Sequence, residues 1–373
     1  MNGTEQKIVL AFVACAASGG RGGVLPCWFD CATGRLEVAG LASGMSHALY
    51  TAVHPTLPVV YAAGDCGASE AKPAGAAFAF SFDLAARELT IINQVGTGGT
   101  SPCYIAVDAT GRSALVANYR GTKAEPSSRG AVSAFPIAGD GSLGARSAFI
   151  EHDGHGPNRE RQTVSHPHSV TIDPENRHAV VADLGTDRLV VYELDAAGAA
   201  LREHATVPVA PGTGPRHLAF HPSGRFAFLI TELGNTIIAY RYDAARGAFD
   251  ERATVRSVPR DFSFPSFAAD IHVHPNGRFV YGSNRGHDSL AICAFDEEAG
   301  TVLLVGHQRT MGMTPRGFAI DPTGRWLLAA NQDSDTIVIF SIDPGSGLLE
   351  QAGEVRGMPS PVCITFAEAG RWP

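Results

Sequence analysis

A repeated unit of short strands constrains this sequence more than any other feature, and its clearest copy is Gly214–Asp243. Three runs rich in β-branched and aromatic residues, Leu218–His221, Phe226–Ile230 and Thr236–Tyr240, predict three strands. Proline, serine, glycine and asparagine fill the gaps, and Pro222-Ser223-Gly224 forms the turn between the first two strands. The unit therefore begins with a β-hairpin that has a turn end and an open end.

The same pattern returns roughly every 50 residues, a period typical of propeller blades. A turn and a fourth strand follow each third strand, for example within Asp195–Pro208 or Asp343–Val355. Four short strands per repeat are the composition of a propeller blade. The further copies are Ser165–Leu194, Ala269–Phe295, Thr314–Ile342, Ser101–Ala117 and a weaker one at His47–Gly64.

The two ends of the chain supply the strands that close the ring. Near the N-terminus, Ile8–Ala14, Val24–Asp30 and Arg35–Leu41 predict three strands, while Pro361–Phe366 resembles a first strand that nothing follows. We therefore predict an all-β, seven-bladed β-propeller in which N- and C-terminal strands share one blade, and a single domain over residues 1–373. Closure of this kind removes exposed sheet edges, which promote aggregation.

Composition excludes several classes of protein. The net charge of −8 disfavours a nucleic-acid surface. The 7 cysteines form no C-x-x-C pair and most lie in expected strands, which favours reduced thiols. The apolar run after Lys7 resembles a short signal peptide, but the closing blade needs it as a strand, so we predict a cytoplasmic protein. No other run approaches the ~20 apolar residues of a membrane helix.

The open end of each hairpin is where chemistry is expected. In Gly214–Asp243 the residues that flank the hairpin are Arg216 and Glu232, so spacing alone places a cation beside a carboxylate. Equivalent ends of all blades face the same way and converge on the central channel. The candidates collected by this rule are His166, His168 and Asp183; Arg216, His217 and Glu232; Asp270, Asn284, Arg285 and His287; Arg316 and Asn331; and Asn118, Tyr119 and Arg120.

The turn end carries repeated residues instead. An arginine follows the turn in every clear copy, and we interpret it as part of the scaffold because it does not vary between blades. The same interpretation applies to His221 and His274, which precede turn prolines. The repeated arginines are Arg112, Arg177, Arg225, Arg278 and Arg325.

A group of arginines, imidazoles and carboxylates suits an anionic substrate. Guanidinium groups bind carboxylate or phosphate and stabilise an oxyanion, and Glu232 or His168 would move a proton. We expect His166, Asp183, Arg316, Asn331 and Asn118 to contact the substrate. Structural alternatives remain open at this point: His166 could bond to backbone between blades, Asp183 could cap its turn, and Arg216 could form a purely structural pair with Glu232.

Other motifs give weaker signals. The glycines at Gly19–Gly23 and Gly96–Gly99 do not lie between a strand and a helix, so no phosphate-binding loop is predicted. No G-x-S-x-G elbow occurs. His152, Asp153 and His155 have metal-ligating side chains, but a glycine-rich surface insertion explains them as well. We therefore predict neither a metal nor a cofactor.

Several of these motifs resemble the seven-bladed propeller lactonases, a family that includes bacterial 6-phosphogluconolactonases and fungal carboxy-muconate lactonizing enzymes. They are SHPHSV, DLGTDRLVVYEL, GPRHLAFHPSGRFAFLITELGNT and SNRG, and the insertion that ends in Arg161-Gln162 is also similar. The resemblance covers nearly the whole chain and implies a cytoplasmic, cofactor-independent enzyme. It implies catalytic roles for His168, Arg216, Glu232 and Arg285. The N-terminal AFVACAASGG departs from the family's usual glycine-tyrosine-threonine stretch.

The resemblance implies hydrolysis of a sugar-acid lactone, with arginines holding the anion and oxyanion and with Glu232 or His168 activating water. A second hypothesis is a carboxy-muconate cycloisomerase that uses the same residues, and a third is a propeller that binds a protein and has no catalytic activity. The expected partner is a small anionic lactone or sugar acid, with no nucleic acid and no membrane. We expect a monomer or a weak homodimer.

Overall fold

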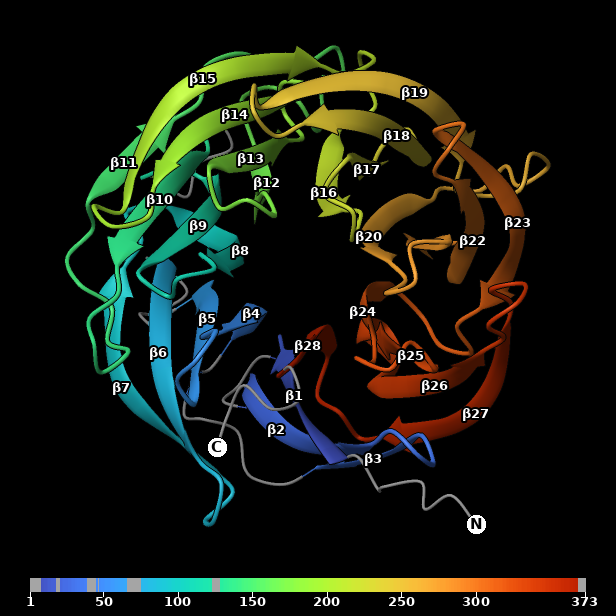
Figure 1. Cartoon of the computed structure of the whole chain (residues 1–373), viewed down its shortest axis with the longest axis horizontal. Helices are drawn as coiled ribbons and strands as arrows, with labels where there is room; N and C mark the ends of the chain where they lie inside the picture. The colour runs from blue at the N-terminus through green and yellow to red at the C-terminus, as the bar shows by residue number, and fades with distance from the viewer. Residues whose placement is uncertain are drawn as a thin grey trace.

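Seven four-stranded antiparallel sheets surround a central channel, as Figure 1 shows for the computed structural model. The structure describes residues 8–17, 21–38, 45, 47–65, 75–122 and 128–367. The predicted all-β, seven-bladed propeller is confirmed. One short 3-10 helix, η1 (Gln332–Ser334), interrupts the strands.

Each blade contributes one strand to each of four concentric positions. The innermost strands are β4 (Ala48–Val53), β8 (Thr100–Val107), β12 (Pro167–Ile172), β16 (Pro215–Phe220), β20 (Phe267–Val273), β24 (Pro315–Ile320) and β28 (Pro361–Phe366). The second strands are β5 (Val59–Asp65), β9 (Ser113–Arg120), β13 (His178–Asp183), β17 (Phe226–Thr231), β21 (Phe279–Arg285), β25 (Trp326–Asn331) and β1 (Ile8–Cys15). The third strands are β6 (Gly75–Asp83), β10 (Ala131–Pro136), β14 (Arg188–Asp195), β18 (Thr236–Asp243), β22 (Ser289–Asp296), β26 (Thr336–Ile342) and β2 (Gly23–Asp30). The outer strands are β7 (Glu88–Gly96), β11 (Ala148–Glu151), β15 (Ala200–Pro208), β19 (Ala248–Arg256), β23 (Thr301–Arg309), β27 (Leu349–Arg356) and β3 (Arg35–Val38).

The closing blade joins both ends of the chain. β28 pairs antiparallel with β1, from Cys15 opposite Pro361 to Ala11 opposite Phe366. The N-terminal apolar run is therefore a strand of the ring, as expected from the repeat. The expected third strand Arg35–Leu41 ends earlier, at Val38, and the following residues lie outside the described part of the chain.

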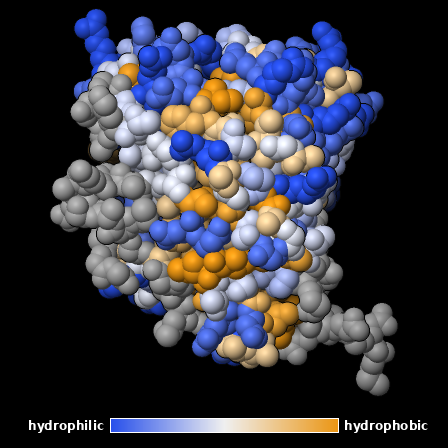
Figure 2. Space-filling view, turned by 90° about the vertical axis from the view of Figure 1, so that its left-hand side faces the viewer, coloured by the Kyte–Doolittle hydropathy of each residue, from blue (hydrophilic) through white to orange (hydrophobic). Residues whose placement is uncertain are grey.

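Apolar side chains fill the spaces between neighbouring blades. One cluster, for example, joins Phe228 and Ile230 of β17 to Val280 of β21 and Cys293 of β22. The outer strands instead alternate exposed and half-buried residues, as in β15 and β19. On the described part of the outer face near β7 and β11, Figure 2 shows hydrophobic and hydrophilic residues interspersed. Stability therefore comes mainly from blade-on-blade burial.

At the turn end, the same hydrogen bonds recur from blade to blade. Asp173 Oδ1 accepts from the amides of Arg177 and His178, both at 2.7 Å, and Asp321 caps its own turn in the same way. His221 uses the other pattern: Nδ1 accepts from the Ser223 amide, while Nε2–H donates to Gly277 O in the next blade at 3.0 Å. These contacts give His221 the structural role that the sequence predicted.

The repeated arginines have a backbone function in every blade that carries them. The carbonyl oxygen of Arg225 accepts from Tyr242 N at 2.8 Å, and the carbonyls of Arg177, Arg278 and Arg325 each accept one amide from the third strand in the same way. Arg112 O accepts from Ile137 N, directly after β10. The side chains of Arg278 and Arg325 also donate to backbone carbonyls of the next blade, at Pro344 and Cys31, so main chain and side chain both serve the scaffold. Among the described residues, no helix is long and apolar enough to cross a membrane.

Candidate functional site

A β-bulge near the open end of each inner strand leaves one residue unpaired in six blades and two residues unpaired in the β20–β23 blade. In β12, Pro167 pairs with Asp183 and Ser169 with Ala182, which leaves His168 unpaired between them. A bulge of this kind redirects the side chain of its extra residue. We call this the bulge position. It holds Leu49, Cys103, His168, Arg216, Arg316 and Val362 in the blades with a one-residue bulge.

A second set of side chains comes from the second strand of each blade, at the residue that follows the one lying opposite the inner-strand residue just before the bulge. In β17 the last paired residue is Thr231, opposite Pro215, and the next residue is Glu232. We call this the exit position. It holds Ala16, Asp65, Tyr119, Leu184, Glu232, Arg285 and Gln332 in the seven blades.

These two sets line a cavity of about 420 Å3 at the open end of the channel. All exit positions except Leu184 take part, together with bulge residues of several blades. The remaining wall comes from His47 before β4, Ser101 near the start of β8, and Arg161 in the insertion before β12. The lining residues are Ala16, His47, Leu49, Asp65, Ser101, Cys103, Tyr119, Arg161, His168, Glu232, Arg285, Arg316 and Gln332.

Glu232 lies at the centre of an arginine cluster. Its Oε2 accepts from Arg216 Nε at 3.0 Å and lies 2.8 Å from Arg285 NH2, and its Oε1 accepts from Arg161 NH2 at 2.5 Å. Burial acts to raise the pKa of Glu232, but the charges of Arg285, Arg216 and Arg161 bring it down to about 2. The carboxylate therefore stays ionised at neutral pH and holds the guanidinium groups in place.

Arg216 is fixed from both sides. It is 1% exposed, and its NH1 donates to Ala269 O at 2.6 Å and to His217 Nε2 at 3.2 Å. His217 donates from Nδ1 to Asp270 Oδ1 at 2.8 Å, which sets the tautomer in which Nε2 accepts from the guanidinium. Burial, then the charge of Arg216, lowers the pKa of His217 to about 4, so this histidine is neutral at pH 7.

Arg316 differs from the other arginines because no side chain or backbone group in the described part of the chain forms a hydrogen bond or ion pair with its guanidinium. It nevertheless lines the cavity, half-buried. Burial, and after it the charge of Arg285, lowers the pKa of Arg316. A guanidinium in this situation has donors available for an anion that enters the cavity.

His168 is a neutral imidazole inside the same cluster. Its Nε2 lies 3.8 Å from Glu232 Oε2, and its buried Nδ1 has no hydrogen-bond partner within the described residues. Burial lowers the pKa of His168 well below 6.5, and the charges of Arg216 and Arg316 contribute in the same direction. The unprotonated ring can therefore accept a proton.

The structure thus brings together His168, Arg216, Glu232 and Arg285, the four residues expected to be catalytic, and adds Arg316. The other four expected substrate contacts do not line the cavity. Asn118 and Asn331 are fully buried, and each donates from Nδ2 to a backbone carbonyl and to a neighbouring hydroxyl.

Asp183 and His166 also have structural positions. Asp183 is fully buried outside the cavity lining and accepts from His166 N, Gly185 N and His152 Nδ1. His166 stacks on Tyr119, with ring centroids 4.2 Å apart, and its Nδ1 lies 2.8 Å from Tyr119 O. This backbone contact is the structural alternative that the sequence left open.

The insertion before β12 contributes a cation. Arg161 contacts both Glu232 and Tyr119, whose hydroxyl lies 3.4 Å from Arg161 NH2. No periodic signal in the sequence locates Arg161, since it belongs to no hairpin. Elsewhere in the insertion, His152 bonds to Asp183 and to Tyr192. The described ranges contain no group of three histidine, cysteine or acidic side chains placed to hold a metal ion.

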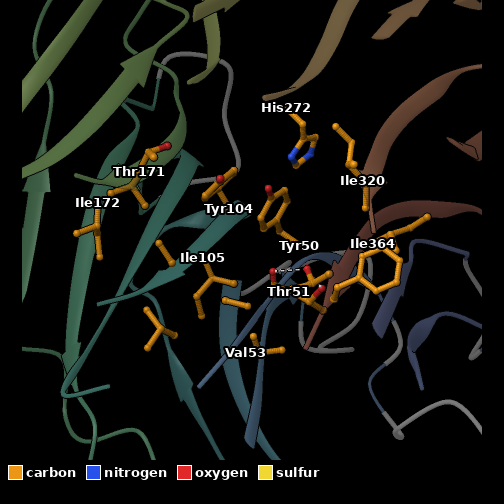
Figure 3. A pocket seen from close by; sticks show the side chains of 17 residues that line it. Tyr50, Thr51, Val53, Tyr104, Ile105, Thr171, Ile172, His272, Ile320 and Ile364 are labelled. Atoms are coloured by element: carbon orange, nitrogen blue, oxygen red, sulfur yellow. Dashed lines mark hydrogen bonds between the residues drawn. The ribbon is translucent and has the colours of Figure 1, made fainter. Parts of the chain in front are cut away.

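A different cavity, of about 380 Å3, lies at the turn end of the channel. Figure 3 shows Tyr50, Tyr104 and His272 pointing toward one another in it, beside isoleucine side chains that include Ile105 and Ile364. The tyrosine rings stack at 3.9 Å, directly after the bulge residues Leu49 and Cys103 that line the first cavity. The channel therefore has a charged cavity at its open end and a largely apolar one at its turn end.

Comparisons with known proteins agree with this architecture. Residues 10–366 match the family model described as lactonase, 7-bladed beta-propeller. A 6-phosphogluconolactonase of Bacillus subtilis is 34% identical over 96% of this chain and 98% of its own length. Another, of Formosa agariphila, is 33% identical over 68% of this chain and 70% of its own.

Among solved structures, the periplasmic gluconolactonase of Pseudomonas aeruginosa superposes with a TM-score of 0.89. It is 30% identical, and the match covers 96% of this chain and 99% of that one. Because that relative is periplasmic, the cytoplasmic location of this protein stays a prediction. The match over nearly the full length, and not the propeller shape alone, settles the relationship: this chain belongs to the seven-bladed β-propeller lactonase family.

Proposed function

We propose that the protein hydrolyses the lactone of an anionic sugar acid, in the manner of a 6-phosphogluconolactonase. The observation that carries this proposal is the Arg316 guanidinium, which no described residue pairs with and which shares one cavity with Arg161, Arg285 and the neutral ring of His168. The names of the relatives support a lactone as the substrate.

The arginines favour an anion for electrostatic reasons. Arg161, Arg216 and Arg285 share a single carboxylate, Glu232, so the cluster keeps excess positive charge before Arg316 is counted. A phosphate or carboxylate would offset that charge, and a guanidinium can bind it through two parallel hydrogen bonds. A fixed guanidinium also stabilises the oxyanion that forms when the lactone carbonyl is attacked.

His168 is the better candidate to activate water. A water oxygen forms a bond to the carbonyl carbon while the imidazole takes one of its protons; the ring C–O bond then breaks and the proton passes to the departing oxygen, leaving a carboxylic acid that ionises. Glu232 is poorly suited to this role because a carboxylate with a pKa of about 2 is a weak base. A bound anion would offset the arginine charges that lower the pKa of His168. The pKa would then rise, and the imidazole would become a stronger base.

Hydrolysis can be followed by acid release at constant pH, with gluconolactone, its 6-phosphate and aldarolactones as substrates. We expect turnover above the spontaneous rate. Replacing Arg316 by alanine should lower kcat/KM for the phosphorylated lactone about 10- to 100-fold, the range for a lost hydrogen bond to a charged group. Arg252→Ala removes an arginine from the outer strand β19, paired with Asp250 at 3.1 Å, and should leave kcat/KM unchanged.

Two results would contradict the proposal. The first is hydrolysis at only the spontaneous rate for every lactone. The second is loss of the ultraviolet absorbance of a carboxy-muconate diene, which would indicate the cycloisomerase instead.

A further inference from the structure

Asp65 places a carboxylate in the cavity across the channel from the arginine cluster. It occupies the exit position of the β4–β7 blade, while Glu232 and Arg285 occupy the exit positions of the β16–β19 and β20–β23 blades on the far side of the ring (Figure 1). The cavity is therefore polarised, with guanidinium groups on one wall and an acid on the other. Nothing in the ion cluster around Glu232 uses Asp65.

One oxygen of Asp65 lacks a hydrogen-bond partner among the residues that the structure describes. Oδ1 is buried and forms no hydrogen bond with any described residue, although Asp65 receives a backbone hydrogen bond from Ser101 and lies near His47. A buried acceptor that stays unsatisfied costs free energy, so an atom in this state is suited to a donor on a ligand. Burial raises the pKa of Asp65, while the His47 charge and the Ser101 bond oppose the rise.

The scaffold does not require an acid at this position. The same exit position is occupied by Tyr119, Leu184 and Gln332 in other blades with the same strand pairing. The local backbone is closely fitted, since a Cβ on Gly64 would lie 1.9 Å from His47 O. That contact fixes the end of β5, and so the place from which Asp65 enters the cavity.

We propose that Asp65 determines specificity by accepting hydrogen bonds from hydroxyl groups of the substrate, so that the cavity selects polyhydroxylated acids over equally charged acids without hydroxyls. This inference rests on the proposed function insofar as the ligand is a sugar acid. A sugar acid has an anionic end for the arginine wall and hydroxyls for Asp65. A site built to bind a hydroxyl discriminates strongly against ligands that lack it, because its own polar group is then left unpaired.

The test compares two ligands of equal charge by isothermal titration calorimetry. One is gluconate 6-phosphate. The other is 6-phosphooxyhexanoate, which has the same carboxylate and phosphate but no hydroxyl groups on its carbon chain. We expect the wild-type protein to bind the first at least about 10-fold more tightly, and Asp65→Ala to reduce that ratio about 10-fold. Asp65→Asn keeps an acceptor oxygen, so its affinity ratio should lie between those of the wild type and Asp65→Ala. Thermal unfolding of both variants shows whether they remain folded.

Three outcomes overturn the inference: an affinity ratio that Asp65→Ala leaves unchanged, a wild-type protein that does not distinguish the two acids, or equal weakening of both ligands. Equal weakening would mean that Asp65 maintains the shape of the cavity and does not bind the hydroxyl groups of the ligand. Catalysis is separate from this result. If no lactone is hydrolysed but the ratio still depends on Asp65, the enzymatic proposal fails and the specificity role of Asp65 stands.

Discussion

The two ends of the inner hairpins differ in how much their residues repeat. At the turn end, Asp173 and Asp321 make the same hydrogen bonds in different blades, and the repeated arginines accept the same backbone bond. At the open end, equivalent positions hold an acid, a cation or an aromatic residue, such as Glu232, Arg285 and Tyr119. Residues that repeat therefore maintain the blades, and residues that vary build the cavity.

Glu232→Gln should have the largest effect at the open end. It leaves three guanidinium groups without a counter-charge, so we expect a loss of about 3–5 kcal/mol in the free energy of unfolding. With the arginines no longer held, kcat/KM should fall about 100- to 1,000-fold. Denaturant titration and the lactone assay measure both.

The matched control is Glu297→Gln at the turn end, where Glu297 pairs with the exposed Arg225 at 2.7 Å. A half-exposed pair contributes at most about 1 kcal/mol, and kcat/KM should not change. Equal effects of the two substitutions would refute the distinction between the two ends.

Asp321→Ala should affect stability alone. The buried carboxylate accepts from the amides of Arg325 and Trp326, both at 2.8 Å, and of Thr323 at 3.0 Å. Loss of these charged hydrogen bonds should lower the free energy of unfolding by about 2–4 kcal/mol. The kcat/KM of the folded fraction should match the wild type, and a large drop in kcat/KM would show that the turn end also shapes the cavity.

The pH profile of kcat/KM tests His168. The active form is unprotonated, and its pKa is lowered by burial and by arginine charges, so activity should persist below pH 6.5 and fall only at lower pH. Unphosphorylated gluconolactone is the right substrate, because a phosphate itself titrates near pH ~6. An acid limb with its midpoint at or above pH 6.5 would argue against His168 as the base.

Cys103 should show the smallest effect. It lines the cavity at a bulge position, but burial raises the pKa of its thiol to about 12. The thiol is therefore protonated at neutral pH and a poor nucleophile. Incubation with iodoacetamide at pH 7, followed by the lactone assay, should leave activity unchanged; rapid inactivation with alkylation at Cys103 would contradict this assignment.

Sequence periodicity was sufficient to predict the ring and the centre of the cluster. Arg216 and Glu232 flank one hairpin, so the turn between them determines that they meet. The rule that selects residues at the open end of each hairpin also selects Asn118, Asp183 and Asn331, which do not line the cavity. Successive residues of a strand point to opposite faces, so each of these three residues turns into its blade. The next residue lines the cavity after Asn118 and Asn331, at Tyr119 and Gln332, whereas Leu184 after Asp183 does not.

Arg161 and Asp65, which both line the cavity, escaped prediction for different reasons. Arg161 reaches Glu232 from an insertion outside the repeat, and no periodic rule locates such a contact. Asp65 does follow the repeat, but its copy is the weakest, and the recognisable sequence pattern ends at Gly64, one residue short. Comparing exit positions across all blades would have identified it.

A crystal structure with gluconate 6-phosphate would test the central claim most directly. We expect an anionic group of the ligand within about 3 Å of the Arg316 guanidinium and a ligand hydroxyl on Asp65 Oδ1, in the cavity at the open end. Binding in the apolar cavity beside Tyr50 and Tyr104, or at the turn end of the blades, would contradict the account.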